Sequence, residues 1–266
     1  MAQWQDSVAL ITGGAQGIGL GIARALARRG TRLALVDLDE KALEGAHSEL
    51  SARTDVVVRR LDVRDRDAFA AAADAVEAEL GPVGILFNNA GIAPYSSLST
   101  LTFEKWDLTL DVNLRGVING VQTFVPRMIA RGEGGYVVNT ASGAGLVGGS
   151  NVLYTTSKYA VVGLSESLKV AGRKYGIEVS VLCPGYVDTD ILRHTAQIGE
   201  GQSVIQPGRG GSESAAAIGQ GVGIDEVGEM VLAGMEAKAM WIHTDASLKT
   251  YVGQRAEALL ASFPEG

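Results

Sequence analysis

The clearest local pattern in this 266-residue chain is the stretch Val8-Ala-Leu-Ile-Thr-Gly-Gly-Ala-Gln-Gly-Ile-Gly19. Residues 8–12 form a short apolar run of the kind found in buried parallel strands. Glycines follow, and apolar residues then recur at helical spacing from Ile22 to Ala27. A strand, a glycine-rich turn and a helix in this order predict a βαβ unit. Its turn would approach a pyrophosphate, which the N–H groups of the helix start would bind.

The glycines at 13–19 have the spacing Gly-x-x-x-Gly-x-Gly, which differs from the commoner Gly-x-Gly-x-x-Gly fingerprint. Taken alone, this turn fits a purely structural role equally well. A second apolar strand, 32–36, ends in Asp37, whose carboxylate can accept hydrogen bonds from both adenosine ribose hydroxyls and would repel a 2′-phosphate. Gln16 stands where an arginine could have bound that phosphate. The pattern therefore favours NAD over NADP, and the alternative is a surface aspartate that ends a strand.

Strands and helices alternate to the end of the chain. Further strands are expected at 56–61, 83–87, 135–139, 177–183 and 240–243, and helices at 39–52, 66–80, 106–131 (two consecutive helices or a bent one), 225–237 and 247–263. This alternation predicts one doubly wound parallel sheet of about seven strands with helices on both faces. No linker, composition break or repeat divides residues 1–266, so we expect a single domain. Gly13, Asp37, Asp62 and Asn89 fall at the carboxyl ends of strands, where ligands of such sheets bind.

The segment from Asn139 to Lys158 contains the residues of an acid/base centre. Tyr154 and Lys158 stand four residues apart where a helical apolar pattern begins, so they would share one helix face. Tyrosine has an ordinary pKa of about 10, and a nearby ammonium would lower it by favouring the phenolate. The hydroxyl of Ser142 could polarise a carbonyl oxygen. This combination suits the interconversion of a carbonyl and an alcohol, although most isolated Tyr-x-x-x-Lys patterns arise by chance.

Composition limits the possible partners. The formal charge of −7 and the pI near 5.1 argue against nucleic acid. Cys183 is the single cysteine and follows an apolar run, so we expect a small buried side chain and no disulfide. The histidines, at 47, 194 and 243, lack metal-ligand spacing, and no metal is expected. Neither a signal peptide nor a membrane span is apparent, which predicts a cytoplasmic protein.

Several short patterns together resemble the short-chain dehydrogenase/reductase family over nearly the whole chain. They stand in the family's order: Thr12-Gly13-x-x-x-Gly17-x-Gly19, Asp37, Asp62-Val63, Asn88-Asn89-Ala90-Gly91, Asn113, Ser142, Tyr154-x-x-x-Lys158 and Pro184-Gly185-x-Val187-x-Thr189. Independent patterns in register are far more specific than any one of them. The resemblance implies a Rossmann-type fold and an NAD(H)-dependent alcohol dehydrogenase or ketone reductase. It also implies a homotetramer or homodimer assembled through the helices at 106–131 and 154–175.

The resemblance further implies roles for individual residues. Ser142 would bind the substrate oxygen and Tyr154 would exchange its proton. Lys158 would lower the Tyr154 pKa and hold the nicotinamide ribose, and Asn113 would bind a water that links Lys158 to solvent. Asn113 taken alone reads as a helix asparagine that satisfies a backbone carbonyl. The other implied cofactor contacts are Gly13, Gln16, Gly17, Ile18 and Gly19 in the turn, Asp37 at the ribose, Asp62 and Val63 beside the adenine, Asn89, Ala90 and Gly91 on the adenosine side, and Pro184, Gly185, Val187 and Thr189, of which the last two would bind the carboxamide.

The substrate contacts are less well defined. Ser142 precedes Tyr154 by 12 residues, one fewer than in much of the family, but the glycine-rich gap tolerates a deletion. We expect an apolar pocket formed by Tyr95, Leu146, Val147, Leu153, Tyr186, Ile191 and Leu192. Residues 190–223 show no regular pattern where the family has its substrate loop. They predict a lid that orders over ligand, with a disordered segment as the alternative.

We therefore expect NAD-linked interconversion of a secondary alcohol and a ketone on an apolar or aromatic substrate. Residues 113–131 and 240–263 most resemble dehydrogenases of bulky aromatic alcohols, such as lignin-type aryl ethers. One alternative is a dehalogenase-like relative that uses Ser and Tyr without a dinucleotide, which the glycine turn and Asp37 oppose. Another is a non-catalytic NAD-binding sensor or scaffold, which would tolerate loss of the catalytic residues, yet all four are present.

Overall fold

A parallel sheet with the strand order β3-β2-β1-β4-β5-β6-β7 forms the centre of the molecule in the computed structural model, which describes residues 4–198 and 218–264. The strands are β1 (Val8–Thr12), β2 (Arg32–Asp37), β3 (Val56–Arg60), β4 (Ile85–Asn88), β5 (Gly135–Thr140), β6 (Ile177–Cys183) and β7 (Trp241–His243). Every neighbouring pair is parallel. The predicted doubly wound, Rossmann-type sheet is confirmed.

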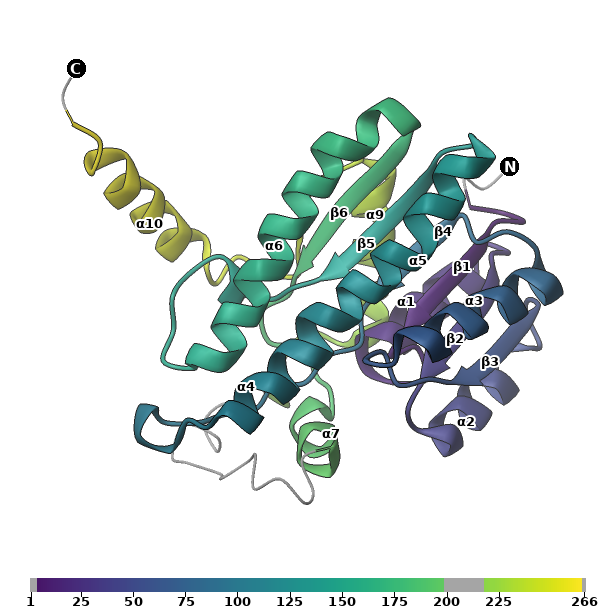
Figure 1. Cartoon of the computed structure of the whole chain (residues 1–266), viewed down its shortest axis with the longest axis horizontal. Helices are drawn as coiled ribbons and strands as arrows, with labels where there is room; N and C mark the ends of the chain where they lie inside the picture. The colour runs from purple at the N-terminus through teal and green to yellow at the C-terminus, as the bar shows by residue number, and fades with distance from the viewer. Residues whose placement is uncertain (1–3, 199–217, 265–266) are drawn as a thin grey trace.

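Helices cover both faces of this sheet (Figure 1). One face carries α1 (Gly17–Ala27), α2 (Glu40–Leu50) and α9 (Ile224–Glu236), and the other carries α3 (Arg66–Leu80), α5 (Gly116–Arg131) and α6 (Val152–Gly172). Strand β1 is buried on both sides, since Ala9 and Ile11 pack into one core cluster and Val8 and Leu10 into the other. This two-sided burial explains why the strand is apolar throughout instead of alternating.

The order of the strands places the carboxyl ends of β1 and β4 at a switch point. From β1 the chain continues to β2 on one side of the sheet, whereas β4 pairs with the other edge of β1. The loops that follow these two strands therefore diverge, and a crevice is left between them. Gly13 follows β1 and Asn89 follows β4, so both predicted contact residues lie at this crevice.

The region predicted as two helices or a bent one consists of α4 (Phe103–Leu110) and α5, joined by a π-helical turn over Asp111–Arg115. Such turns are rare and occur often at functional sites. Asn113 lies in this turn and is fully buried.

The expectation that residues 190–223 lack regular structure is wrong for the first part of this segment. Ile191–Ile198 forms the helix α7, and Val222 pairs with Val187 in an isolated bridge. Tertiary contacts stabilise α7, because Thr195 is buried and its Oγ1 accepts a 2.9 Å hydrogen bond from the backbone of Ala93. Residues 199–217, the centre of the predicted lid, lie outside the described part of the chain.

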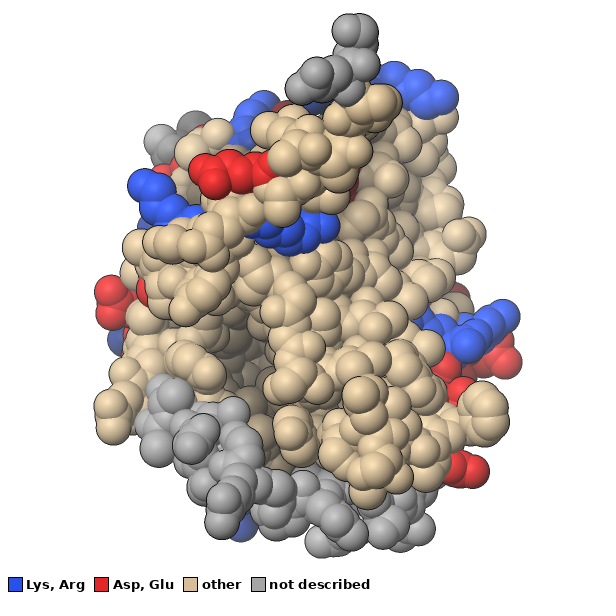
Figure 2. All heavy atoms as spheres, turned by 90° about the vertical axis from the view of Figure 1, so that its left-hand side faces the viewer, with Lys and Arg blue, Asp and Glu red and all other residues tan. Residues whose placement is uncertain are grey.

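The last helix, α10 (Lys249–Ala261), extends away from the sheet and has no buried residue (Figure 1). On this side of the molecule, charged side chains lie across the upper part of the face and at its two sides (Figure 2). Over residues 4–198 and 218–264, no helix combines the length and the hydropathy required to cross a membrane.

Candidate active site

A cavity of about 340 Å³ lies at the carboxyl end of the sheet, where the loops after β1, β2, β3, β4, β5 and β6 meet. Of the residues predicted from sequence, the following line it: Gly13, Gln16, Gly17, Ile18, Asp37, Asp62, Val63, Asn89, Ala90, Gly91, Tyr154, Lys158, Pro184, Thr189 and Ile191. They come from positions up to 178 residues apart, Gly13 to Ile191, and the parallel sheet brings them to one edge.

The glycine turn between β1 and α1 leaves room for a ligand close to the backbone. Gly13 and Gly17 have φ angles of +61° and +54°, a region that glycine adopts without strain. The first turn of α1 contains no acidic side chain, so its N–H groups and the positive end of the helix dipole face no competing carboxylate. Gly19 does not line the cavity. A Cβ there would lie 2.0 Å from the carbonyl oxygen of Gly13, so its role is close packing.

Asp37 ends β2 with its carboxylate at the cavity. Its Oδ2 accepts a hydrogen bond from the backbone of Ala15 (3.2 Å), and its Oδ1 accepts one from Asp39 (3.2 Å). Burial raises the pKa of Asp37, while the backbone N–H groups of Asp39 and Ala15 oppose this shift. These bonds fix the carboxylate toward the glycine turn, which is the position expected of a ribose acceptor.

Thr12 and Asn89 tie the first and fourth strands together below the cavity. The Oγ1 of Thr12 accepts hydrogen bonds from the backbone N–H groups of Asn89 (2.9 Å) and Ala90 (3.0 Å). In return, the Asn89 side chain donates to the carbonyl oxygens of Thr12 (3.2 Å) and Gly13 (3.3 Å). The Asn89 side chain thus holds the glycine turn in place as well as lining the cavity.

Tyr154 and Lys158 lie on one face of α6, as their spacing predicted. The Lys158 Nζ is 5.5 Å from the centroid of the Tyr154 ring and donates a 3.0 Å hydrogen bond to the carbonyl oxygen of Thr140. The side chain of Asn151 caps the helix by accepting from the backbone of Tyr154 (3.3 Å), which sets where α6 begins.

The pKa of Tyr154 differs from the lowered value expected from the sequence. Burial raises the pKa of Tyr154 above its ordinary value, and a hydrogen bond with the Ser142 side chain opposes the shift only in part. Burial also lowers the pKa of Lys158 to about 8. The expected lowering of the Tyr154 pKa by Lys158 is therefore not found in the cofactor-free protein, because desolvation is the leading influence on the pKa of each group.

Asn113 lies beside the cavity and not in its wall. Its Oδ1 accepts from the backbone of Ile92 (2.8 Å), and its Nδ2 donates to the Ile92 carbonyl (2.9 Å) and to Ser157 Oγ (3.1 Å). The side chain therefore joins the loop after β4 to α6. These bonds match the reading of Asn113 as a residue that satisfies backbone groups, and its predicted water contact stays a prediction.

Two residues of the 184–189 segment serve packing. The N–H of Gly185 donates to Thr244 Oγ1 (3.1 Å), and a Cβ on Gly185 would lie 1.9 Å from the carboxylate of Asp245. Val187 is buried in the core cluster beneath α1 and α9. Only Pro184 and Thr189 of this segment's predicted contacts reach the cavity wall.

Most of the predicted substrate residues are not brought to this cavity. Leu153 is fully buried and Leu146 packs on the core cluster between α5 and α6, whereas Tyr186 is 54% exposed. Tyr95, Val147 and Leu192 also lie outside the cavity wall, and Ser142 reaches the site through its hydrogen bond with Tyr154. Ile191 alone of the predicted apolar set lines the cavity.

Comparison with known proteins decides the family. A family model described as "short chain dehydrogenase" matches residues 7–198, more than half of the chain. This chain belongs to the short-chain dehydrogenase/reductase family. Members of this oxidoreductase family similar to it include the C alpha-dehydrogenase of Sphingobium sp. strain SYK-6, which is 33% identical over 278 residues, covering 98% of this chain and 88% of that protein.

Solved structures of short-chain dehydrogenases share the fold at full length. A short-chain dehydrogenase/reductase from Burkholderia phymatum, described in complex with NAD, superposes with a TM-score of 0.91 at 32% identity, with complete coverage of both chains. The apo form of LigO from Sphingobium sp. strain SYK-6 has a TM-score of 0.84 at 34% identity, covering 98% of this chain and 90% of that one.

Sequence reasoning missed part of the cavity wall of this short-chain dehydrogenase. The additional residues are Leu38, Asp39, Leu61, Ile92, Val112, Thr140, Ala141, Asp190, His194, Gln197 and Ile198. Those up to Ala141 mostly adjoin predicted residues and could have been found by extending each motif by one position. The residues of α7 carry no motif, so only the folded chain reveals them. No cluster of three or more potential metal ligands occurs among the residues that the structure describes.

Proposed function

We propose that this protein is an NAD-dependent oxidoreductase that interconverts a secondary alcohol and a ketone. The observation that supports this most directly is that Tyr154 and Lys158 share one cavity with Asp37 and the glycine turn. An acid/base pair at one end and a ribose acceptor at the other are the two requirements for hydride chemistry on a dinucleotide.

The residues around the cavity suit NAD. Gly13 and Gly17 leave the backbone open to a pyrophosphate, and α1 directs its N-terminal N–H groups at the same place. The carboxylate of Asp37 suits ribose hydroxyls and disfavours a 2′-phosphate. The NAD complex described for the Burkholderia relative supports the same cofactor here. Hydride transfer is the chemistry that this dinucleotide supplies when bound.

The protein's own groups handle the proton and the substrate oxygen. With its raised pKa, Tyr154 is protonated near neutral pH, which is the form that donates a proton to a ketone oxygen. Ser142 would hold the same oxygen through its hydroxyl. Alcohol oxidation needs the phenolate, and the ammonium of Lys158 would stabilise that charge. Lys158 would also bind the nicotinamide ribose, with Asn113 linking it to solvent through a water. NAD preference favours the alcohol-to-ketone direction in cells.

For the substrate, we propose an apolar or aromatic secondary alcohol. The name of the Sphingobium relative, C alpha-dehydrogenase, and the similarity to LigO support a dehydrogenase of this type. The scarcity of charged side chains at the centre of the face shown in Figure 2 fits an uncharged substrate. We further propose a homotetramer or homodimer in the cytoplasm, with residues 190–223 as a lid, and light scattering would measure the oligomeric state.

Tyr154→Phe tests the proposed chemistry. A panel of secondary alcohols is supplied with NAD, and the absorbance of the reduced cofactor is followed. Loss of the acid/base group should lower kcat by about 10²- to 10⁴-fold, while NAD binding, measured by calorimetry, stays close to that of the wild type. Tyr175→Phe is the matched control, because Tyr175 lies in the short 3-10 turn after α6 (Arg173–Tyr175), where it is 40% exposed.

Each contrary outcome points to a different function. If Tyr154→Phe turned over alcohols at the wild-type rate, the assigned acid/base role would be wrong. If the wild type bound NAD but oxidised no alcohol and reduced no ketone, the sensor or scaffold alternative would be favoured. Failure to bind NAD at all, with release of halide from halohydrins, would point to the dehalogenase-like alternative.

A further inference from the structure

The helix α7 forms part of the wall around the cofactor cavity, and no sequence motif assigns its residues. Ile191, His194, Gln197 and Ile198 lie along one face of the helix and line the same cavity as Asp37. Thr195 anchors the helix, since it accepts from the backbone of Ala93 (2.9 Å) and donates to the Ile191 carbonyl (2.6 Å). The helix is therefore positioned over the cavity by a specific contact.

The tautomer of His194 follows from its neighbour. Arg193 is bound to Asp190 (2.7 Å), and its Nη2 lies 3.0 Å from the Nε2 of His194. A guanidinium can only donate hydrogen bonds, so Nε2 is the acceptor and the proton of the neutral ring is on Nδ1. Burial and the charge of Arg193 lower the pKa of His194, against the opposing effect of nearby carboxylates, which keeps the ring neutral near pH 7.

His194 lines the same cavity as Asp37 and Asp39, and the charges of both carboxylates act on its ring. The cavity wall therefore combines acceptor carboxylates with one N–H donor. A hydroxyl group fits such a pair, because it donates to a carboxylate and accepts from an imidazole N–H. A 2′-phosphate offers oxygens to His194 and Arg193 but meets the charge of both aspartates.

We propose that His194 is a binding residue for the adenosine half of the dinucleotide, donating Nδ1–H to a ribose hydroxyl that Asp37 also binds. This inference rests on the proposed NAD-dependent function and adds to it a contact from the segment expected to serve the substrate. α7 would thus bind the cofactor through His194. Arg193 acts as the positioning residue that fixes the tautomer of the His194 ring.

The test is the affinity of the full-length protein for NAD and for ADP-ribose, measured by calorimetry without substrate. Loss of one hydrogen bond in His194→Ala should weaken both ligands by about three- to tenfold. His194→Asn keeps an N–H donor near the place of Nδ1 and should recover most of the loss. Ala196→Ser is the matched control, because Ala196 is an exposed residue of the same helix outside the cavity wall.

The outcomes separate this inference from the proposed function. A wild type that binds neither ligand would overturn both. A wild type that binds NAD, with His194→Ala binding as tightly as Ala196→Ser, would overturn the role of His194 alone. If His194→Asn weakened binding as much as His194→Ala, the donor role would be contradicted. The ring would then only fill space. Circular dichroism melting of each variant establishes that the helical fold persists.

Discussion

At the scale of single residues, burial governs the catalytic pair. Lys158 is only 3% exposed, and burial is the leading cause of its lowered pKa. A lysine pKa near 8, against an ordinary 10.5, places a free-energy penalty on the folded, cofactor-free protein of about 3 kcal/mol. The cation that would favour a phenolate is thus maintained at the expense of stability.

Lys158→Met should stabilise the cofactor-free protein at pH 7 while abolishing turnover. The lysine pKa is lowered on folding, so the unfolded chain binds more protons above pH 8, and wild-type stability rises as pH increases from about 8 toward 10.5. The penalty is complete below pH 8, where the variant should melt higher by about 2–4 °C per kcal/mol. Scanning calorimetry at pH 7 and pH 9 should show the difference shrinking, and a constant difference would contradict this account.

Asp37→Ala should change which dinucleotide is preferred. Removing the carboxylate deletes charged hydrogen bonds to the ribose, worth about 1.5–3 kcal/mol, and removes the repulsion of a 2′-phosphate. The ratio of kcat/KM for NADP to that for NAD should rise at least about tenfold. Asp55→Ala is the control, because it makes the same charge change at an exposed position before β3, at the amino end of the strands. The ratio of kcat/KM for NADP to that for NAD should stay at the wild-type value in this variant.

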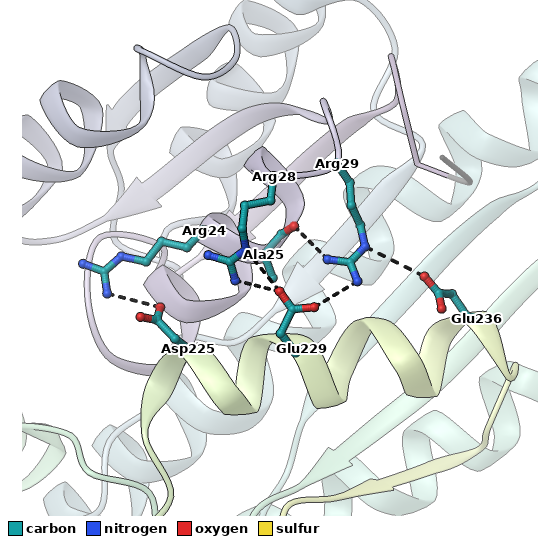
Figure 3. Close-up of polar contacts among 7 residues, drawn as sticks. All are labelled: Arg24, Ala25, Arg28, Arg29, Asp225, Glu229 and Glu236. Carbon is teal, nitrogen blue, oxygen red and sulfur yellow. Dashed lines mark hydrogen bonds and ion pairs between the residues drawn. The ribbon is translucent and has the colours of Figure 1, made fainter. Parts of the chain in front are cut away.

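At the scale of elements, α1 and α9 are held together by small residues and ion pairs. A Cβ on Gly228 would lie 2.2 Å from the Gly21 carbonyl oxygen, so the two helix backbones cross closely. Along the same contact, Glu229 pairs with Arg28 (2.7 Å) and Arg29 (2.9 Å) (Figure 3). These side chains are partly exposed, so the close crossing contributes more than the charges. The helix proposed to face the pyrophosphate is thereby fixed to the segment that follows the predicted lid.

Gly228→Ala should lower the free energy of unfolding by about 1–3 kcal/mol, because neither helix backbone can move aside. Gly45→Ala is the control, since it makes the same replacement at an exposed position of α2 with no atom within 4 Å of the new Cβ. There the loss of unfolded-state entropy should stabilise the protein by about 0.4–1 kcal/mol. Urea unfolding of both variants measures the difference, and equal effects of the two replacements would refute the close-crossing argument.

At the scale of the whole molecule, the cavity joins parts of the chain that are distant in sequence. Its wall is formed by the ends of six strands, by α6 and by α7. Filling it should therefore stabilise all of these elements together. NAD at 100 times its Kd should add about 2.7 kcal/mol to the free energy of unfolding.

This linkage is measured by a thermal shift with NAD, with NADP at the same concentration as the comparison. Hydrogen exchange should slow over 191–198 when NAD is present, since α7 would then contact the ligand. It should not change over α10, which has no buried residue. Equal protection of α10 and α7 would contradict a local effect of the cofactor.

Much of the fold could be predicted because its signals are local. The apolar run of β1, the glycine turn and the helical spacing after it lie within 20 consecutive residues, 8–27, and each reflects burial or backbone freedom of its own segment. The i, i+4 spacing of Tyr154 and Lys158 likewise needs only the geometry of one helix. Asp37 could be assigned to the cavity because parallel strands bring their carboxyl ends to one edge.

Other properties could not be read from single segments. Leu153 and Ile191 are equally apolar, yet one is fully buried in the protein and the other lines the cavity, and only the packing of α6 and α7 separates them. The position of α7 depends on the hydrogen bond from the Ala93 backbone to Thr195 Oγ1, which joins residues 102 positions apart in the sequence. The raised pKa of Tyr154 depends on what surrounds it, which no motif encodes.

The amino-acid pattern by itself therefore determined the order of strands and helices, the parallel sheet and the identity of the reactive side chains, because each depends on spacing along the chain. Tertiary structure alone decided the protonation of Tyr154 and Lys158, the placement of α7 and the presence of His194 in the same cavity wall as Asp37. The reason is physical: desolvation and long-range contact depend on neighbours in space, and these neighbours exist only once distant segments have packed.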